Sequence, residues 1–255
     1  MGAIRLEIEG AVAVATIDTP PVNALKLADY AEIGDLFERL GKDRTTHCVV
    51  LTGAGDRAFC AGKDLKEFLA ARVEDDAEQA KVVRRAYSAI LHCEIPTIAA
   101  VNAAALGAGA VLASVCDIRL AAAATARFAL PEINVGRCGG GAHLGRHIPQ
   151  GALRRMFFTG RSIDAQEAWR LGFVQEVHEP GALLPAALEL AREIAAKAPL
   201  GLRIGKAALN EAERLPLEEG YVREQEASTR LMATHDAREA TRAVVEKRPP
   251  AFVGR

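Results

Sequence analysis

One segment, residues 95–136, constrains the fold of this chain most strongly; it reads IPTIAAVNAAALGAGAVLASVCDIRLAAAATARFALPEINVG. It begins as an apolar strand, turns through small residues, continues as an apolar helix and returns as a second strand that starts beside Asp117. The segment closes on Glu132, a lone carboxylate in an apolar loop. Unpaired N–H groups at a helix start can bind an oxyanion, and a nearby carboxylate can move a proton. The segment therefore predicts a site of this kind between buried strands and helices.

The composition excludes several classes of partner. The 255 residues carry a net charge of −1, which gives no basic surface for nucleic acid or for an anionic membrane. No apolar run is long enough to span a bilayer, and the alternating N-terminus is unlike a signal peptide. The five cysteines are odd in number and lack paired metal-ligand spacing, so we expect reduced thiols and a cytoplasmic protein.

Strands and helices alternate over the first half of the chain. Alternating apolar residues on both sides of Gly10 predict a β-hairpin over residues 4–17. Helical spacing of apolar residues predicts a helix over residues 25–40 that ends at Gly41. The same patterns predict a buried strand over residues 48–52 and two helices, over 64–71 and 75–93. This alternation is typical of an α/β protein.

Helices predominate in the second half of the chain, and its last part is wholly helical. Helices are predicted around residues 143–147 and 151–158, and another begins at Ser162, with Glu167 near its first turn. Gly172 ends that helix ahead of a strand over residues 173–177. From Gly181 onward, helical spacing predicts three or four helices, near whose starts lie Pro185, Pro199 and Pro216.

Two glycine turns could supply backbone donors. Ala61 and Gly62 come directly before one predicted helix, and Gly107 and Gly109 open another. Small residues let a backbone approach a ligand, and two converging N–H groups are what an oxyanion hole requires. A tight turn or a closely packed helix without any ligand would give the same pattern, so each motif alone leaves both interpretations open.

The side chains that could react also have simpler explanations. Glu132 in apolar surroundings suits a general acid/base, but it could equally be an exposed loop residue or the partner of Arg137. His143 and His147 have helical metal-ligand spacing without a third ligand, which favours ordinary helix residues. Cys60 and Cys138 would need a positioned base to act as nucleophiles, and Lys247 and Arg248 fit a solvated tail better than a phosphate site.

Taken together, these motifs resemble the enoyl-CoA hydratase/isomerase family of the crotonase superfamily. The resemblance rests on PPVNAL (20–25), VVLTGAGDRAFCAGKDL (49–65), IPTIAAVNAAALGAGAVLASVCDIRLAA (95–122), FALPEINVG (128–136), FTGRSIDAQEAWRLGFVQEV (158–177) and VVEKRPPAFVGR (244–255). It implies a spiral of repeated ββα units over residues 1–195, which holds an acyl-CoA site. Residues 196–255 would form a helical region that drives trimer formation, as a trimer or as a hexamer made of two trimers, and closes the site. No metal and no separate cofactor are implied, because coenzyme A is part of the substrate.

The resemblance also implies roles for individual residues. The N–H groups of Lys63 and Ala108 match the oxyanion-hole donors, and Glu132 matches an acid/base glutamate. The matched positions along the substrate and coenzyme A site are Val22, Ala24, Ala61, Asp64, Leu65, Gly107, Val111 and Gly140. Lys247 or Phe252 would reach a ligand from the C-terminal end.

One departure from the family pattern bears on the reaction. Hydratases of this type carry a second glutamate where this chain has Val111. They also have a Gly-Gly-Thr-Gln-Arg ending where this chain reads RCGGGAHLGR (137–146), which keeps a glycine at Gly140 but differs at His143 and Leu144. Family members with one glutamate include double-bond isomerases and hydratase-lyases. We therefore expect a hydratase/isomerase-type enzyme in which Glu132 alone serves an enolate. The alternatives are decarboxylation, retro-aldol cleavage or hydrolysis of a thioester, the last with a role for His143, and a catalytically weak homologue that only binds acyl-CoA.

Overall fold

A six-stranded sheet forms the centre of the structure, a computed structural model that describes residues 2–255. The first two strands form the predicted antiparallel hairpin, and the remaining strands all pair in parallel. In sheet order the strands are β1 (Ile4–Glu9), β2 (Val12–Ile17), β4 (Cys48–Gly53), β7 (Thr97–Val101), β9 (Ile118–Ala122) and β12 (Glu176–His178). Strands β4 and β7 are buried along their whole length because helices cover both faces of the sheet.

Each of three central strands leads into a short strand of a second sheet. In sheet order this second sheet contains β11 (Ile163–Asp164), β10 (Arg127–Ala129), β8 (Ala104–Leu106) and β5 (Ala58–Cys60). A third, two-stranded sheet pairs β3 (Ala24–Leu25) with β6 (Gly62–Lys63) in parallel. The succession β4–β5, β7–β8 and β9–β10, each followed by helices, is the spiral of repeated ββα units that the resemblance implied.

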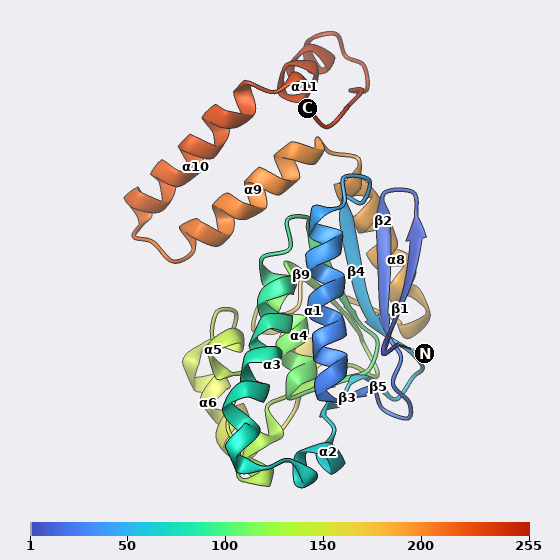
Figure 1. Ribbon diagram of the computed structural model, residues 1–255. Coiled ribbons are helices and arrows are strands. Elements are labelled where there is room, and N and C mark those ends of the chain that lie inside the picture. The colour runs from blue at the N-terminus through green and yellow to red at the C-terminus, as the bar shows by residue number, and fades with distance from the viewer. Residues whose placement is uncertain (1) are drawn as a thin grey trace.

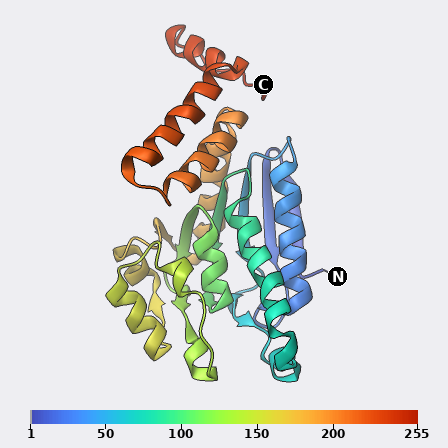
Figure 2. The same cartoon turned by 60° about the vertical axis from the view of Figure 1, so that its left-hand side comes forward.

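The helices cover the central sheet in two layers. Helices α1 (Leu27–Lys42) and α3 (Asp76–Leu91) lie side by side in both ribbon views, with α4 (Ala108–Val115) next to α3 (Figures 1 and 2). Helix α8 (Pro180–Ala195) packs on β2, β4, β7 and β9 from the other side. The shorter helices are α2 (Leu65–Ala70), η1 (Val73–Asp75), η2 (Pro131–Val135), α5 (Gly141–Leu144), α6 (Gln150–Thr159) and α7 (Ala165–Arg170).

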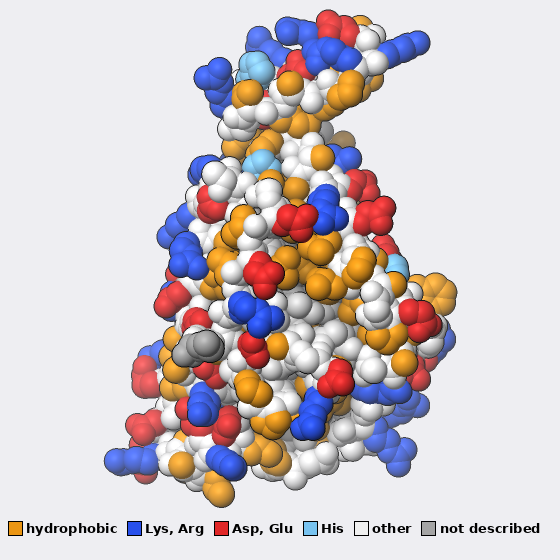
Figure 3. All heavy atoms as spheres, turned by 90° about the vertical axis from the view of Figure 1, so that its right-hand side faces the viewer, with side chains coloured by type: hydrophobic (Ala, Val, Ile, Leu, Met, Phe, Trp, Pro, Cys, Tyr) orange, Lys and Arg blue, Asp and Glu red, His pale blue; other side chains and the backbone are white. Residues whose placement is uncertain are grey.

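The last three helices project from this body. They are α9 (Pro199–Ala212), α10 (Leu217–Met232) and α11 (His235–Val245). Figure 1 shows them at the end of the molecule opposite α2, and Figure 3 shows them as a narrow extension above the body. Together with α8 they give the helical C-terminal part that the sequence predicted. No helix within residues 2–255 is both long and apolar enough to cross a membrane.

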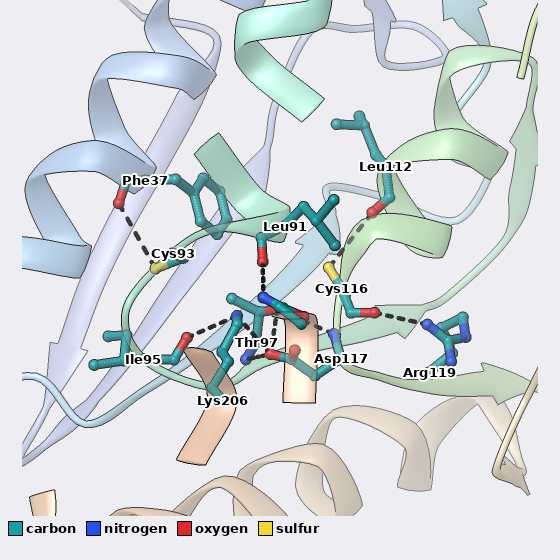
Figure 4. A network of polar contacts seen from close by, with 11 residues as sticks. Phe37, Leu91, Cys93, Ile95, Thr97, Leu112, Cys116, Asp117, Arg119 and Lys206 are labelled. Atoms are coloured by element: carbon teal, nitrogen blue, oxygen red, sulfur yellow. Dashed lines mark hydrogen bonds and ion pairs between the residues drawn. The ribbon is translucent and has the colours of Figure 1, made fainter. Parts of the chain in front are cut away.

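Buried cations attach α9 to the body. The Lys206 ammonium donates to the Asp117 carboxylate at 2.7 Å and to the Ile95 carbonyl at 3.1 Å (Figure 4). Asp117 also accepts bonds from the backbone N–H and the hydroxyl of Thr97, at 2.7 and 2.9 Å. One turn earlier on α9, Arg203 donates to Glu94 and to the backbone carbonyls that follow α1. The buried Lys206 ammonium is therefore paired with a carboxylate that is itself partly exposed.

Several predicted boundaries were wrong for local reasons. Residues 24–25 form β3, so α1 begins at Leu27, and it continues through Gly41 to Lys42. Gly41 instead allows close packing, because a Cβ there would lie 3.1 Å from the Glu94 nitrogen. Pro185 lies inside α8, which begins earlier at Pro180.

Two further corrections concern the chain around α7. This helix begins after Asp164 rather than at Ser162, since the Asp164 carboxylate accepts the Glu167 N–H and caps it. Glu167 does lie in the first turn, as predicted. The following strand is β12, at residues 176–178, whereas Phe173 and Val174 are buried in the connection before it.

Candidate active site

The two glycine turns meet in space. Gly62, with φ +99°, is followed by Lys63 in β6, and Gly107, with φ +53°, is followed by Ala108 at the start of α4. A Cβ on Gly62 would lie 3.0 Å from the Leu106 carbonyl oxygen, and one on Gly109 would lie 2.1 Å from that of Cys60. Only glycine permits this contact, so the sequence itself brings the two turns together. As the first residue of α4, Ala108 has an N–H without a partner inside the helix.

A cavity of about 470 Å³ opens beside these turns. One side consists of the turns themselves, through Ala61, Gly62, Lys63, Gly107 and Ala108. A second side is one face of α3, through Asp76, Gln79, Ala80, Val83, Arg84 and Tyr87, which recur at helical spacing. The third side is η2 and the loop after it, including Glu132, Arg137 and Gly140. Segments far apart in the chain thus enclose one space.

Glu132 has its carboxylate at the base of α4. A Cβ on Gly107 would lie 2.6 Å from the Glu132 Oε1 atom, so any side chain there would displace the carboxylate. The other oxygen, Oε2, is buried and has no hydrogen-bond partner among residues 2–255. Burial raises the pKa of this carboxyl above its ordinary value. A carboxylate held in this way can accept a proton and release it again near neutral pH.

Val111 lies one turn into α4 on the same side of the cavity. It is 3% exposed, and its Cγ2 atom would be 2.9 Å from a Cβ placed on Gly140. Gly140, with φ +75°, therefore carries the loop directly against Val111. The cavity lining is therefore apolar one turn into α4, and Glu132 has no second carboxylate beside it at this position.

Two tyrosines and a histidine close the inner end of the cavity. The rings of Tyr30 and Tyr87 meet edge to face with centroids 6.2 Å apart, and both residues line the cavity. Burial raises the pKa of both phenols, so each stays protonated and can donate a hydrogen bond. His143 packs against Tyr87 at 5.5 Å between centroids, but it does not line the cavity. Burial lowers the pKa of His143, which favours the neutral imidazole.

An aromatic ring between two cations lies at the rim of the cavity. The Phe68 ring has the Lys63 ammonium 5.4 Å from its centroid and the Arg137 guanidinium 5.1 Å away. Arg137 forms an ion pair with Asp76 at 2.7 Å, and Lys63 donates to Gln79 at 3.3 Å. Arg137 is thus the partner of Asp76, which removes the interpretation of Glu132 as its partner.

The structure places the other predicted positions at the edge of this site. Ala24 of β3 lies opposite Gly62 of β6, and the Ala61 N–H donates to the Val22 carbonyl at 3.1 Å. Asp64 caps α2 by accepting from the N–H groups of Lys66 and Glu67. Ala61 and Leu65 line the cavity, whereas Val22, Ala24 and Asp64 lie behind it.

The remaining predicted groups lie elsewhere. Lys247 and Phe252 are at the far C-terminal end and do not line the cavity of their own chain. Cys60 is buried and its pKa is raised to about 12, which makes it a poor nucleophile at neutral pH. Exposed Cys138 lines the cavity. Among residues 2–255 no group of three or more acidic, histidine or cysteine side chains could hold a metal ion.

Sequence reasoning missed the α3 side of the cavity. The sequence predicts this helix over residues 75–93 but gives it no part in the site. Its spacing of Gln79, Val83 and Tyr87 forms a stripe, which was the available signal. The pattern alone does not show what the stripe faces, because another side of the same cavity is formed by η2, far along the chain.

Comparison with known proteins agrees with this fold and site. The family model described as enoyl-CoA hydratase/isomerase matches residues 7–255. A short-chain-enoyl-CoA hydratase of Clostridium acetobutylicum is 35% identical over 249 residues, which cover 96% of this chain and 95% of that protein. A crotonyl-CoA hydratase of Syntrophomonas wolfei is 34% identical over 256 residues, covering 99% and 98%.

A solved structure is similarly close. The crystal structure of an enoyl-CoA hydratase from Bacillus anthracis superposes with a TM-score of 0.95 at 32% identity, covering 99% of this chain and 100% of that one. The chain therefore belongs to the enoyl-CoA hydratase/isomerase family, and it has the crotonase fold.

Proposed function

We propose that this protein is an enzyme of the enoyl-CoA hydratase type, which acts on an acyl-CoA thioester. The observation that carries the proposal is the half-buried Glu132 carboxylate with a free oxygen, set against the glycine that begins α4. The N–H groups of Lys63 and Ala108 lie on the two turns beside it and would bind the thioester oxygen as it becomes an enolate oxygen. The similarity to named hydratases supports the same chemistry.

One carboxylate suffices for the addition of water. Glu132 takes a proton from water while the water oxygen bonds to C3 of the enoyl group. The electron pair of the C2=C3 bond moves toward the thioester oxygen, which the Lys63 and Ala108 N–H groups stabilise. Glu132 then gives its proton to C2, which forms the 3-hydroxyacyl thioester and restores the carboxylate. The raised pKa of Glu132 suits both steps.

Val111 favours a second candidate within the same site. The Val111 side chain has no ionisable group and cannot help to activate water, so water addition depends on Glu132 alone. Moving the double bond of a 3-enoyl thioester needs only one carboxylate, which takes a proton from C2 to form a dienolate and returns the proton to C4. We therefore propose double-bond isomerisation as the alternative reaction of this site.

The test supplies a 2-enoyl-CoA and a 3-enoyl-CoA separately and follows the products by mass. Hydration adds the mass of one water to the 2-enoyl substrate. Isomerisation leaves the mass of the 3-enoyl substrate unchanged while its double bond moves. Loss of carbon dioxide, release of an aldehyde or release of free coenzyme A would instead support decarboxylation, retro-aldol cleavage or hydrolysis.

The Glu132→Gln variant decides whether the protein is a catalyst at all. If the wild type binds acyl-CoA but turns over no thioester faster than Glu132→Gln does, the proposed role of Glu132 fails and a homologue that only binds acyl-CoA remains as the alternative. Glu179→Gln, at the N-terminal end of α8, is a matched control because Glu179 does not line the cavity.

We further propose that residues 196–255 assemble three copies of the chain, or six. Exposed apolar side chains on α9 to α11 support this; they include Leu209, Leu217, Tyr221, Met232, Val244 and Val245. Sedimentation should give a mass of three or six times 27.1 kDa, and a monomer would contradict the proposal. A cytoplasmic location is supported by the five free cysteines, four of which are buried.

A further inference from the structure

The cavity carries more positive than negative side chains. Lys63, Arg84 and Arg137 line it, against Asp76 and the reactive Glu132. The whole chain has a net charge of −1, so this excess is a local property of the cavity. Asp76 is already bound to Arg137 at 2.7 Å. Among residues 2–255, neither the partly buried Lys63 nor the exposed Arg84 forms an ion pair with a carboxylate.

The Lys63 side chain lines the cavity, and its backbone belongs to the turn whose N–H would bind the thioester oxygen. Its ammonium donates to the Gln79 side chain, on the first turns of α3, at 3.3 Å. Among residues 2–255 it has no carboxylate within ion-pair distance, although the side chain is partly buried. A partly buried ammonium without a counterion is a costly arrangement unless a ligand supplies the negative charge.

Arg84 also lacks a counterion, in contrast to its neighbour Arg85. Arg85 lies on the outer face of α3, and its guanidinium forms ion pairs with Asp35 and Glu38 at 2.6 and 2.7 Å. Arg84 lines the cavity, and within the described residues its side chain has neither an ion pair nor a hydrogen bond. Arg85, which does not line the cavity, therefore has carboxylate partners, whereas the guanidinium of Arg84, which lines it, is free to bind a ligand.

We infer that the site accepts an acyl group with a second carboxylate at its far end, and that Lys63 and Arg84 bind this carboxylate. The inference rests on the proposed function and names its substrate class. The α3 stripe from Asp76 to Tyr87 gives a wall of roughly 16 Å along the helix, at 1.5 Å per residue, on which such a chain can lie. The apolar positions Ala80 and Val83 on this wall contact the methylene groups between the two carbonyl carbons.

The phosphates of coenzyme A are a second source of negative charge. A cation that binds them contributes equally whatever the acyl group is, whereas a cation that binds the distal carboxylate separates two acyl groups that differ only there. The comparison of hex-2-enoyl-CoA with hex-2-enedioyl-CoA, the same chain with a terminal carboxylate, therefore distinguishes the two sources.

The experiment measures kcat/KM for both thioesters in the wild type and in the double variant Lys63→Gln, Arg84→Gln. The backbone N–H of residue 63 is kept in this variant. We expect the wild type to prefer the dicarboxylic substrate by about tenfold or more, as expected for hydrogen bonds to a charged group, and the double variant to lose most of this preference. An equal loss for both substrates would assign the two cations to the phosphates and overturn the inference.

The matched control is Lys81→Gln, Arg85→Gln. It also removes one lysine and one arginine charge, both from α3, but Lys81 and Arg85 are exposed, form ion pairs with other residues and do not line the cavity. We expect the substrate preference of this control to equal that of the wild type. A similar loss in the control would show that net charge alone sets the preference, which would also overturn the inference.

Binding of saturated thioesters separates this inference from the proposed function. Calorimetry of adipoyl-CoA and hexanoyl-CoA needs no turnover, and we expect adipoyl-CoA to bind about tenfold more tightly. Equal affinities would contradict the inference even if both enoyl thioesters are turned over. Absence of turnover with either enoyl thioester would contradict the proposed function, whatever the two affinities are.

Discussion

Asp117 and Glu132 are two carboxylates from one segment of the chain, and they have opposite surroundings. Asp117 accepts three hydrogen bonds, from Lys206 at 2.7 Å and from the Thr97 backbone and hydroxyl at 2.7 and 2.9 Å. Glu132 has a buried oxygen that accepts none from the described residues. A carboxylate oxygen held by several hydrogen bonds fastens elements together, whereas an unpaired one stays free to exchange a proton. The predictions below test this division between a structural and a reactive acid.

The largest expected effect is on the rate. Glu132→Gln keeps the shape of the side chain and removes its ability to take a proton, so we expect kcat to fall by about 100- to 10,000-fold. Steady-state kinetics on the preferred thioester measure this, with Glu179→Gln as the control. A fall of less than tenfold would mean that Glu132 is not the main proton carrier.

The second effect is on stability. Lys206→Met leaves the Asp117 charge without its partner next to α9, and we expect it to lower the free energy of unfolding by about 3–5 kcal/mol. Lys197→Met is the control, because Lys197 is exposed and its contact with Glu193 is 3.8 Å; its effect should be about 0.5 kcal/mol or less. Urea unfolding at equal protein concentration measures both, and equal losses would contradict a structural role for Asp117.

The third effect concerns Val111, the apolar residue of α4 that lines the cavity. Val111→Glu introduces a second carboxylate, and we expect it to raise the hydration rate about tenfold or more over Val111→Gln, which has the same size without the charge. Both variants should be less stable than the wild type, since residue 111 is 3% exposed. Equal hydration rates for the two variants would show that the site cannot use a second acid there.

The smallest effect is a gain in stability from losing the reactive acid. The pKa of Glu132 is raised by burial, so the folded state binds the proton more tightly than the unfolded state does. Ionisation therefore costs stability above the unfolded pKa, and this cost is absent at lower pH. Glu132→Gln should raise the melting temperature at pH 7 by about 2 °C or less, and this difference should shrink toward pH 4. A lower melting temperature at pH 7 would contradict the unpaired state of Glu132.

The sequence was most informative where short-range patterns determine the structure. The hairpin around Gly10 and the strand at residues 48–52 follow from alternation and apolar runs, and the structure contains both. The two glycine turns were visible because glycine has few other uses directly before a buried helix. Resemblance to a family then supplied the order of the ββα units, which periodicity alone does not fix.

Long-range pairing was beyond the sequence. Nothing local indicated that Lys206 would bind Asp117, or that Arg137 would bind Asp76, because each pair joins segments far apart in the chain. Gly41 shows the same limit, since it was taken as a helix stop and serves instead to let the chain near Glu94 approach. The charges on α3 were visible as a pattern, but only the fold separates Arg84 in the cavity from Arg85 on the surface.

The most direct test of the account follows the C2 proton of a saturated acyl-CoA in heavy water. Such a thioester cannot add water or move a double bond, so exchange at C2 reports only on enolate formation at the oxyanion hole by a base. The account predicts that the wild type and Asp117→Asn exchange C2 protons for deuterium and that Glu132→Gln does not. Exchange by Glu132→Gln at the wild-type rate would contradict the assignment of Glu132 as the base.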